Sequence, residues 1–426
     1  TPELGGIEPG RPNPAEAFLG LLRREVLART PGAALGQESM EAEIFPVSAD
    51  TAEAAARFER ALGRIAEPLC ALADGFAARL DAQAEELDDS ARAHIEGACR
   101  SIERRALNRL TAWREMLGRL TEPAPEPGTR PQHLLFARIE RRPAGDRDVA
   151  LLRHWLDPTI PFAITLAQPA HGLLVTSATL RDWEAGDPEA VWEAAEARVG
   201  ASHLASPAIR VAVASPFDYG AQTRVFVVTD VAQELGQLAA AYRALFLAAG
   251  GGALGLFTAI RRLKAVHEKI APSLEEAGIP LYAQHVDPMN NTTLVDIFRT
   301  EEHACLLGTD AMRDGVDVPG RSLRMVVFER VPWSRPDILH RARRLHLSGG
   351  DPSGYDDRIA RLRLRQAFGR LIRTGADRGV FLLLDRQAPT RLLGALPAGV
   401  AARRVGLRQA VLDTRAFLAE AVLPKA

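Results

Sequence analysis

The 426-residue chain has few cysteines and no long apolar run, and each shortage excludes a class of protein. Its three cysteines, Cys70, Cys99 and Cys305, are too few and too scattered for a four-cysteine zinc or iron–sulfur site. They also predict no disulfide framework, so we expect a reducing, cytoplasmic location. No apolar stretch reaches the length of a membrane span and no signal peptide is recognisable, so we expect no membrane partner.

The charges are nearly balanced, with 53 basic and 54 acidic residues and a net charge of -1. A nucleic-acid-binding groove must therefore be local, because the chain as a whole is not basic. Hydrophobic and charged contents of 47% and 25% are ordinary for a globular protein. The length predicts two or three domains.

The first part of the chain has a helical pattern. Residues 15–30 have apolar side chains spaced for one helical face, and residues 51–120 form a long alanine-rich pattern interrupted at Leu87–Ser90. We predict two long antiparallel helices there, with Asp50 and Ser90 as N-caps. This region is either a lever or clamp, or a helical bundle with solvated faces. The proline-rich stretch 121–131 marks its end.

After residue 131 short apolar runs alternate with helical stretches. This alternation predicts an α/β fold with a largely parallel sheet and flanking helices. The predicted strands are His133–Ile139, Leu173–Thr176, Val225–Val228, Leu254–Phe257, Pro280–Ala283, Ala304–Leu307, Met325–Phe328 and Val380–Leu384, and the predicted helices are Ala259–Ile270, Thr293–Arg299 and Arg358–Arg373.

One predicted helix, Arg361–Arg373, has a polar stripe. Gln366, Arg370 and Arg373 are spaced i, i+4 and i+7, which predicts that they project from one helical face. Gly369 lies in the same helix, where glycine costs about 1 kcal/mol relative to alanine and is explained most simply by a close approach to the backbone. This arrangement suits a polyanion such as a triphosphate, while the alternative is a surface helix with solvated arginines.

Hydroxyl and acidic residues follow three predicted strands. Ser177, Ala178 and Thr179 come after Leu173–Thr176, and Thr258 follows another strand and precedes a helix. Small hydroxyl residues at strand ends can bind phosphate or relay a change between loops, although an ordinary turn and a plain N-cap explain them as well.

A third strand is followed by a glycine-rich loop, Gly308–Gly320, which carries two aspartates. Thr309, Gly315 and Asp317 in this loop are candidates for ligand contacts, since glycines permit close ligand approach at the carboxyl edge of a sheet. A merely tight loop is the alternative.

Taken in order, LLVTSATL, SPFDY, LGLFTAIRRL, LLGTDAMRDGVDVPGRSLRMVVFERVPW and QAFGRLIRTGADRGVFLLLD resemble the later motifs of the DinG/XPD-like helicases of superfamily 2. The resemblance runs from about residue 131 to the C-terminus. It implies a helical arch-like region at 1–130, the C-terminal end of a first RecA-like domain at 131–183, and a second RecA-like helicase domain at 184–426.

The chain has neither a Gly-x-x-x-x-Gly-Lys-Ser/Thr loop nor a DEAH box. In the resembled family these motifs precede the arch and hold ATP and Mg²⁺. We therefore expect this chain to be the C-terminal half of a longer enzyme and to be inactive alone. Its expected partners are the missing N-terminal RecA-like half of the same polypeptide and single-stranded or forked DNA, and any iron–sulfur cluster would lie outside it.

The resemblance also implies roles for the candidate residues in an ATP-dependent, 5′-to-3′ bacterial DNA-repair helicase. Arg370 and Arg373 would reach the γ-phosphate and Gln366 would orient them or the attacking water. The remaining assignments are nucleotide binding for Gly315, Asp317 and Gly369, coupling for Ser177, Ala178 and Thr179, and DNA phosphate contacts for Thr258 and Thr309. Two alternatives stay open: a non-catalytic module with a RecA-like fold that binds nucleic acid or a partner, and a helicase-like ATPase acting on RNA.

Overall fold

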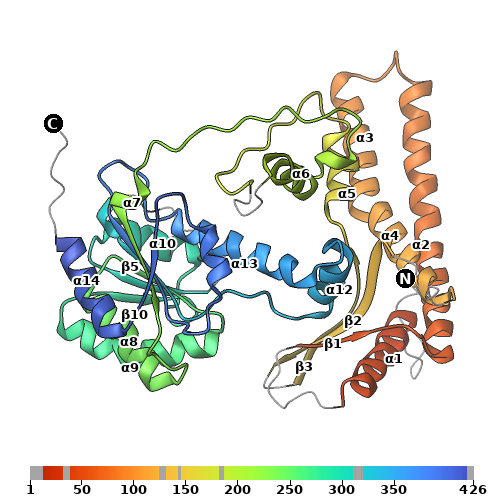
Figure 1. Ribbon diagram of the computed structural model, residues 1–426. Helices are drawn as coiled ribbons and strands as arrows, with labels where there is room; N and C mark the ends of the chain where they lie inside the picture. Colours follow the sequence, from red (N-terminus) through yellow and green to blue (C-terminus); the bar gives the residue numbers. More distant parts are fainter. Residues whose placement is uncertain are drawn as a thin grey trace. The chain divides into compact units, whose positions relative to one another are not determined.

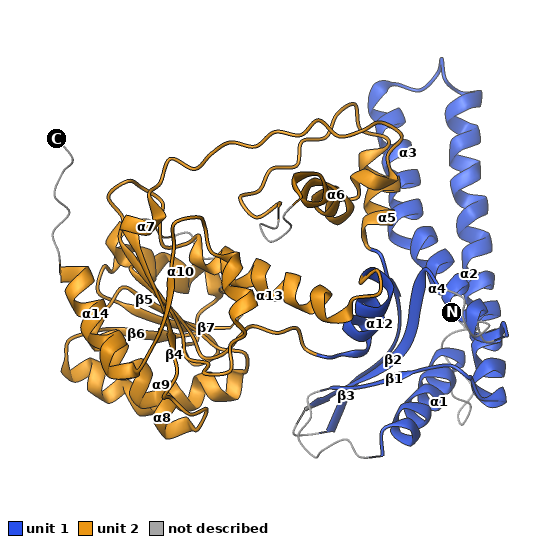
Figure 2. Ribbon diagram, viewed as in Figure 1, with its two compact units in different colours: residues 1–157, 336–347 blue, residues 158–335, 348–426 orange. Residues whose placement is uncertain are grey.

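The computed structural model describes residues 13–31, 39–123, 131–142, 145–181, 187–309, 312, 318 and 320–419. The chain divides into two compact units (Figure 2). Unit 1 comprises residues 1–157 and 336–347, and unit 2 comprises residues 158–335 and 348–426. The domain boundaries predicted at residues 130 and 183 stay predictions. The two units group residues that pack together, which does not test boundaries between functional domains. Among the described residues, no helix has the length and apolarity needed to cross a membrane.

Unit 1 combines long helices with a small antiparallel sheet. Its helices are α1 (Pro14–Arg29), α2 (Ala49–Ala82), α3 (Asp89–Ile102), the π-helical turn η1 (Glu103–Leu107), α4 (Asn108–Gly118), the 3₁₀ turn η2 (Arg119–Thr121) and α12 (Ile338–Leu347). Its strands β1 (Ser39–Glu43), β2 (His133–Arg142) and β3 (Gly145–Trp155) pair in that order, all antiparallel. The predicted long helical pair is confirmed, whereas the sheet is an addition, because only His133–Ile139 was expected as a strand.

The helix starts in unit 1 differ from the predicted ones. Ser48 caps α2 by accepting from the backbone N–H of Thr51, and Asp88 caps α3 by accepting from that of Ala91 at 2.6 Å. The predicted caps Asp50 and Ser90 lie two residues later, inside the first turn of each helix. Either pair of side chains is chemically able to cap, so composition did not separate them.

Unit 2 is built on a seven-stranded sheet. Its strands run in the order β10-β4-β9-β8-β5-β7-β6, and every neighbouring pair is parallel. They are β4 (Thr223–Val228), β5 (Ala253–Leu256), β6 (Leu281–Ala283), β7 (Cys305–Gly308), β8 (Met325–Phe328), β9 (Gly379–Leu383) and β10 (Ala402–Val405). This confirms the predicted parallel α/β fold, and six of the predicted strands lie within a residue or two of the observed ones.

Helices cover both faces of this sheet (Figure 1). Phe226 and Val228 face one core and Val225 and Val227 the other, as the two-residue period of a strand requires. The first core contains α8 (Leu235–Ala249), α9 (Ile260–Glu276) and α14 (Leu407–Ala419), and the second contains α10 (Asn291–Thr300), α13 (Pro352–Phe368) and the 3₁₀ segment η6 (Thr390–Ala395). Burial on both sides explains why these strands read as unbroken apolar runs.

Close packing explains why a glycine occupies one position in the sheet, Gly255. A Cβ at Gly255 would lie 2.7 Å from Cδ2 of Leu307 and 2.8 Å from the ring of Tyr242. Tyr242 is wholly buried beside this strand and stacks on Phe257 with ring centroids 4.8 Å apart. The glycine therefore makes room for an aromatic side chain.

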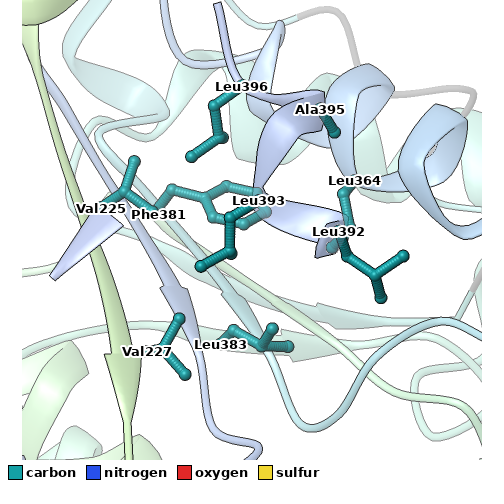
Figure 3. A pocket seen from close by; sticks show the side chains of 9 residues that line it. All are labelled: Val225, Val227, Leu364, Phe381, Leu383, Leu392, Leu393, Ala395 and Leu396. Atoms are coloured by element: carbon teal, nitrogen blue, oxygen red, sulfur yellow. The ribbon is translucent and has the colours of Figure 1, made fainter. Parts of the chain in front are cut away.

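On the other face, nine apolar side chains from β4, β9, α13, η6 and the residue after η6 line a small pocket (Figure 3). Because none of them carries a polar group, the pocket offers no contact to a phosphate and is part of the packing that seats α13 on the sheet. They are Val225, Val227, Leu364, Phe381, Leu383, Leu392, Leu393, Ala395 and Leu396.

The first part of unit 2 has the short helices α5 (Thr159–Phe162), η3 (Ala163–Ala167), α6 (Pro188–Val199), η4 (Ala201–His203) and α7 (Tyr219–Gln222). The strand predicted at Leu173–Thr176 is wrong. This stretch pairs with no strand in the described part of the chain, and Leu174 is 87% exposed. Residues 209–213 are likewise paired with no described strand, and Ile209 and Val213 are 95% and 89% exposed. Both have strand-like sequences but no neighbouring strand to bond.

Candidate nucleotide and nucleic-acid sites

The polar-stripe helix ends earlier than predicted. Helix α13 begins at Pro352, with Asp351 as its N-cap, and ends at Phe368, with Gly369 as its C-cap. The backbone N–H groups of Arg370 and Leu371 bond three residues back instead of four, to the carbonyls of Ala367 and Phe368. The helix thus tightens and stops, as helix C-termini commonly do. The expectation that Gln366, Arg370 and Arg373 share one helical face is therefore wrong.

The chain beyond α13 is a fixed turn. The buried carboxylate of Asp377 accepts from the backbone N–H groups of Arg373 and Thr374, each at 2.7 Å, and from the Thr374 hydroxyl at 2.9 Å. The side-chain amide of Gln222 donates to the carbonyls of Thr374, Gly375 and Asp377 at 3.0–3.2 Å. These bonds hold the Arg373 backbone in place although its side chain is exposed.

The predicted ATP-site residues gather around this turn. Gln366 and Arg370 are half-buried, whereas Gly369 and Arg373 are exposed. A Cβ at Gly369 would lie 3.3 Å from the Arg365 carbonyl of its own helix, and its φ of −62° is ordinary for any residue. Its proposed role in nucleotide binding stays a prediction.

A second cluster lies at the carboxyl end of β5. The backbone N–H and the hydroxyl of Thr258 both donate to one oxygen of Glu329, at 2.8 and 2.5 Å. The other oxygen of Glu329 accepts from Nε of Arg262 at 2.6 Å. Glu329 is wholly buried just beyond β8. Because the carboxylate takes the Thr258 hydroxyl proton, the exposed Thr258 oxygen presents lone pairs to solvent in this arrangement.

Gln233 extends the cluster. Its amide nitrogen donates to the carbonyls of Glu329 and Leu384, at 3.0 and 2.7 Å, and its amide oxygen accepts from Arg262 and Arg330. One side chain thereby ties the ends of β8 and β9 to α9. Burial also raises the pKa of Tyr242, whose hydroxyl donates to the carbonyls of Leu256 and Val327 just beneath.

Thr309, at the end of the neighbouring strand β7, repeats the same geometry. Its N–H and hydroxyl both donate to the side-chain oxygen of Gln284, at 2.9 and 2.8 Å. Gln284 is 4% exposed and its amide nitrogen donates to Asn291. Thr258 and Thr309 thus follow adjacent strands and are held in the same way, so the structure brings the two predicted DNA contacts to one edge.

The two groups of candidates lie at opposite edges of the sheet. Thr258 and Thr309 follow the strands they adjoin, whereas the turn with Arg370 and Arg373 precedes β9. Because all strands run in the same direction, the threonines lie at the carboxyl edge and the turn at the amino edge. The sheet therefore separates the candidate nucleic-acid contacts from the candidate γ-phosphate contacts.

The segment around Ser177 forms an exposed turn. The Ser177 hydroxyl accepts from the Thr179 N–H at 3.1 Å and lies 3.0 Å from the Thr179 hydroxyl, and Ala178 lies between them. Just beyond, the Arg181 carbonyl accepts from Arg365 of α13 at 2.8 Å. This bond links the predicted coupling segment to the helix that precedes the arginine turn.

Gly315 and Asp317 lie outside the described residues. Sequence reasoning missed Glu329, Asp377, Gln222 and Gln284, which fix the candidate residues without being candidates themselves. Glu329 could have been found, because it directly follows the apolar run Met325–Phe328, as Thr258 and Thr309 follow theirs.

A model of the helicase C-terminal domain family matches residues 243–398. The 3′-5′ exonuclease DinG of Bacillus subtilis is 34% identical over 147 residues, which are 34% of this chain and 16% of that protein. The ATP-dependent helicase DinG of Mycobacterium tuberculosis is 33% identical over 198 residues, which cover 43% of this chain and 28% of that protein. The ATP-dependent DNA helicase YoaA of Escherichia coli is 30% identical over 192 residues, which cover 42% of this chain and 29% of that protein.

Residues 243–398 thus match a helicase C-terminal domain, and over the matched segments the chain is similar to DinG and YoaA helicases. The matched segments span less than a third of each of these three relatives. A solved structure of XPD without ligand is also similar, at 14% identity and a TM-score of 0.46, over 90% of this chain and 68% of its own. The matched family segment includes both Thr258 and the arginine turn, so the helicase portion carries both edges of the sheet.

Proposed function

We propose that this chain supplies the second RecA-like half of an ATP-dependent DNA helicase that unwinds in the 5′-to-3′ direction. The observation that supports it most directly is the turn after α13. Two arginines of this turn, Arg370 and Arg373, would contact the γ-phosphate of an ATP held by the other half. A bidentate guanidinium suits that task, because it neutralises the charge that develops on the phosphoryl oxygens in the transition state.

The turn has the rigidity that this role requires. A charge that stabilises a transition state must be in position before the reaction, since reorganisation during it costs free energy. Asp377 and Gln222 together make six hydrogen bonds that fix the backbone from Arg373 to Asp377. Gln366, one turn before the end of α13, would orient the arginines or the attacking water, and Gly369 would leave space beside them.

The other half of the ATP site would lie outside this chain. The sequence contains neither a Walker A loop nor a DEAH box. In the described residues no group of three His, Cys, Asp or Glu side chains is placed to hold a metal ion. In this proposal an upstream RecA-like half binds Mg²⁺ and most of the ATP, and the chain alone does not turn over ATP. An iron–sulfur cluster is likewise not expected from these three cysteines.

Two exposed stretches support a first RecA-like sheet as the partner. Leu173–Val175 and, around Arg210, the side chains of Ile209, Val211 and Val213 are apolar and exposed, and neither stretch pairs with a strand in the described part of the chain. Exposing such segments to water is unfavourable, and both their backbones and their side chains suit strands of another sheet. Ser177, Ala178 and Thr179 would then stand at the end of one such strand and couple ATP hydrolysis to movement.

DNA would be held through its phosphates, without sequence preference, at the carboxyl edge near Thr258 and Thr309. Since the hydroxyl and backbone N–H protons of both threonines are engaged, neighbouring cations such as Arg262 would contribute, or the threonines would rotate on binding. Gly315 and Asp317 would belong to the loop that follows Thr309 and responds to the nucleotide.

The test is ATPase activity and single-stranded DNA affinity of Arg370→Lys and Arg373→Lys in the full-length parent. An arginine finger contributes about 10³ to 10⁵ in turnover, and lysine keeps the charge but loses the planar fork, so most of that loss should appear. DNA affinity should hardly change. Near-normal hydrolysis in both variants would contradict the assignment and favour a non-catalytic binding module, and preference for RNA would favour the RNA-directed alternative.

A further inference from the structure

A basic hollow lies on the helical part of unit 1, outside every site described above. It is lined by Gly97, Arg100, Ser101, Arg104 and Arg105. These residues follow i, i+3, i+4, i+7 and i+8 spacing along α3 and η1, so they share one face. Cys99, on the opposite side of α3, points its sulfur to the Ala73 carbonyl of α2. The hollow therefore opens away from the neighbouring helix.

The lining has only positive charge. Three guanidinium groups contribute to it and no carboxylate does. Glu96 lies 3.9 Å from Arg100, but both side chains are about half exposed or more, and such a surface pair contributes little. Arg104 and Arg105 are exposed. Like charges at i and i+4, as at Arg100 and Arg104, are mutually repulsive along a helix. An anion in the hollow would relieve that repulsion.

The backbone here is also unusual. Residues 103–107 form a π-helical turn, a rare feature that is often found at functional sites. Gly97 lines the hollow, and a Cβ there would meet no heavy atom within 4 Å apart from its chain neighbours and the backbone of its own helix. No packing in the described structure therefore requires a glycine in the middle of α3, where it costs about 1 kcal/mol relative to alanine. The open space beside Gly97, with three arginines around it, admits an anionic ligand.

We infer that this hollow binds the phosphodiester backbone of single-stranded DNA, as a contact additional to the carboxyl edge of the sheet. Arg100 to Arg105 extend over about 7.5 Å of helix at 1.5 Å per residue, which suits successive phosphates of a chain better than one isolated phosphate. Guanidinium groups bind phosphate oxygens without reading bases. The identity of the polyanion as DNA rests on the proposed function, whereas the location of the binding site rests on the hollow alone.

The experiment measures binding of a fluorescein-labelled single-stranded oligothymidylate to the purified chain over a series of salt concentrations. The variants are Arg104→Gln with Arg105→Gln, and a control with the same loss of charge, Arg24→Gln with Arg57→Gln, on exposed positions of α1 and of the first turns of α2. Each lost phosphate contact lowers the slope of log affinity against log salt by about 0.7 for single strands. We expect the hollow variant to lower the slope by about 1.4 and the control to leave it unchanged.

A second pair of variants excludes misfolding as the cause. Gly97→Glu adds a negative charge to the lining of the hollow, and Gly97→Gln adds nearly the same volume without charge. Both replace glycine with a better helix former, so neither should weaken α3. We expect Gly97→Glu to reduce binding clearly more than Gly97→Gln.

Equal slopes for the hollow and control variants, or equal binding by the two Gly97 variants, would overturn the inference and leave the proposed function intact. Absence of any salt-dependent DNA binding by the wild-type chain would also overturn it, whereas the proposed function would still be decided by the ATPase of the full-length arginine variants. Displacement of the oligothymidylate by polyglutamate at equal charge would show a site for anions in general and would refute the nucleic-acid assignment.

Discussion

Replacing Glu329 should destabilise unit 2 much more than replacing a glutamate in an equally short ion pair at the surface. Glu329 is wholly buried, and its carboxylate accepts from Thr258 twice and from Arg262 at 2.6 Å. In Glu329→Gln one oxygen still accepts from Thr258, but the new amide group presents N–H where Arg262 needs an acceptor. The substitution therefore creates a buried donor–donor contact and removes the charge.

The size of the effect follows from burial. Breaking a buried ion pair typically costs 3–5 kcal/mol, and a lost hydrogen bond to a charged group about 1.5–3 kcal/mol. Arg262 is 26% exposed in its side chain and keeps its bonds to Gln233, which moderates the loss. We expect the free energy of unfolding of unit 2 to fall by about 3 kcal/mol.

Glu302 provides the matched control. Its carboxylate lies 2.6 Å from Nε of Arg321, the same distance as in the Glu329 pair, but the two side chains are 46% and 77% exposed. Exposed pairs contribute about 0–1 kcal/mol, so Glu302→Gln should cost no more than that. Urea unfolding of both variants, followed at a unit 2 probe, measures the difference. Equal losses, or a loss below about 0.5 kcal/mol for Glu329→Gln, would refute the argument from burial.

Two further predictions concern titration and thiol chemistry. Burial first, and then the nearby Arg343 and Arg138, lower the pKa of His154 below its ordinary value of 6.5. As the pH falls through 6.5, the unfolded chain therefore binds more protons at this position than the folded chain, so unit 1 should lose stability on acidification. His154→Phe should flatten the dependence of the urea unfolding midpoint on pH between pH 7.5 and 5.5. Burial raises the pKa of Cys305 to about 12. A thiol reagent should therefore modify the unit 1 cysteines in the native chain, but Cys305 only when unit 2 unfolds. Rapid modification of Cys305 in the native chain would contradict its buried position in β7.

The sheet was predictable because its strands are buried on both faces. A fully buried strand is an unbroken apolar run bounded by turn residues, and six strands of unit 2 have that pattern in the sequence. The same signal failed at Leu173–Thr176. An apolar run indicates the ability to form a strand, but pairing also needs a neighbour, and none of the described strands lies beside it.

The arrangement of the candidate residues was not predictable from the local pattern. Helix spacing predicted that Arg370 and Arg373 share a helical face with Gln366, whereas α13 ends at Phe368 and both arginines follow it. The turn that replaces it depends on Gln222, about 150 residues earlier, and on Asp377. Contacts so distant in sequence leave no local periodicity, so no pattern within the motif could have indicated them.

The two edges of the sheet nevertheless follow one structural rule. At each edge a buried acceptor, Glu329 or Asp377, accepts from a backbone N–H and a threonine hydroxyl and so fixes the chain next to a candidate contact. Between them the strands are packed on both faces and have little room to deform. We therefore expect that a ligand bound at one edge causes no rearrangement inside the sheet that reaches the other edge. Rigid-body movement of the whole sheet and its helices connects the two edges at a lower cost in free energy, because it preserves both hydrogen-bond networks.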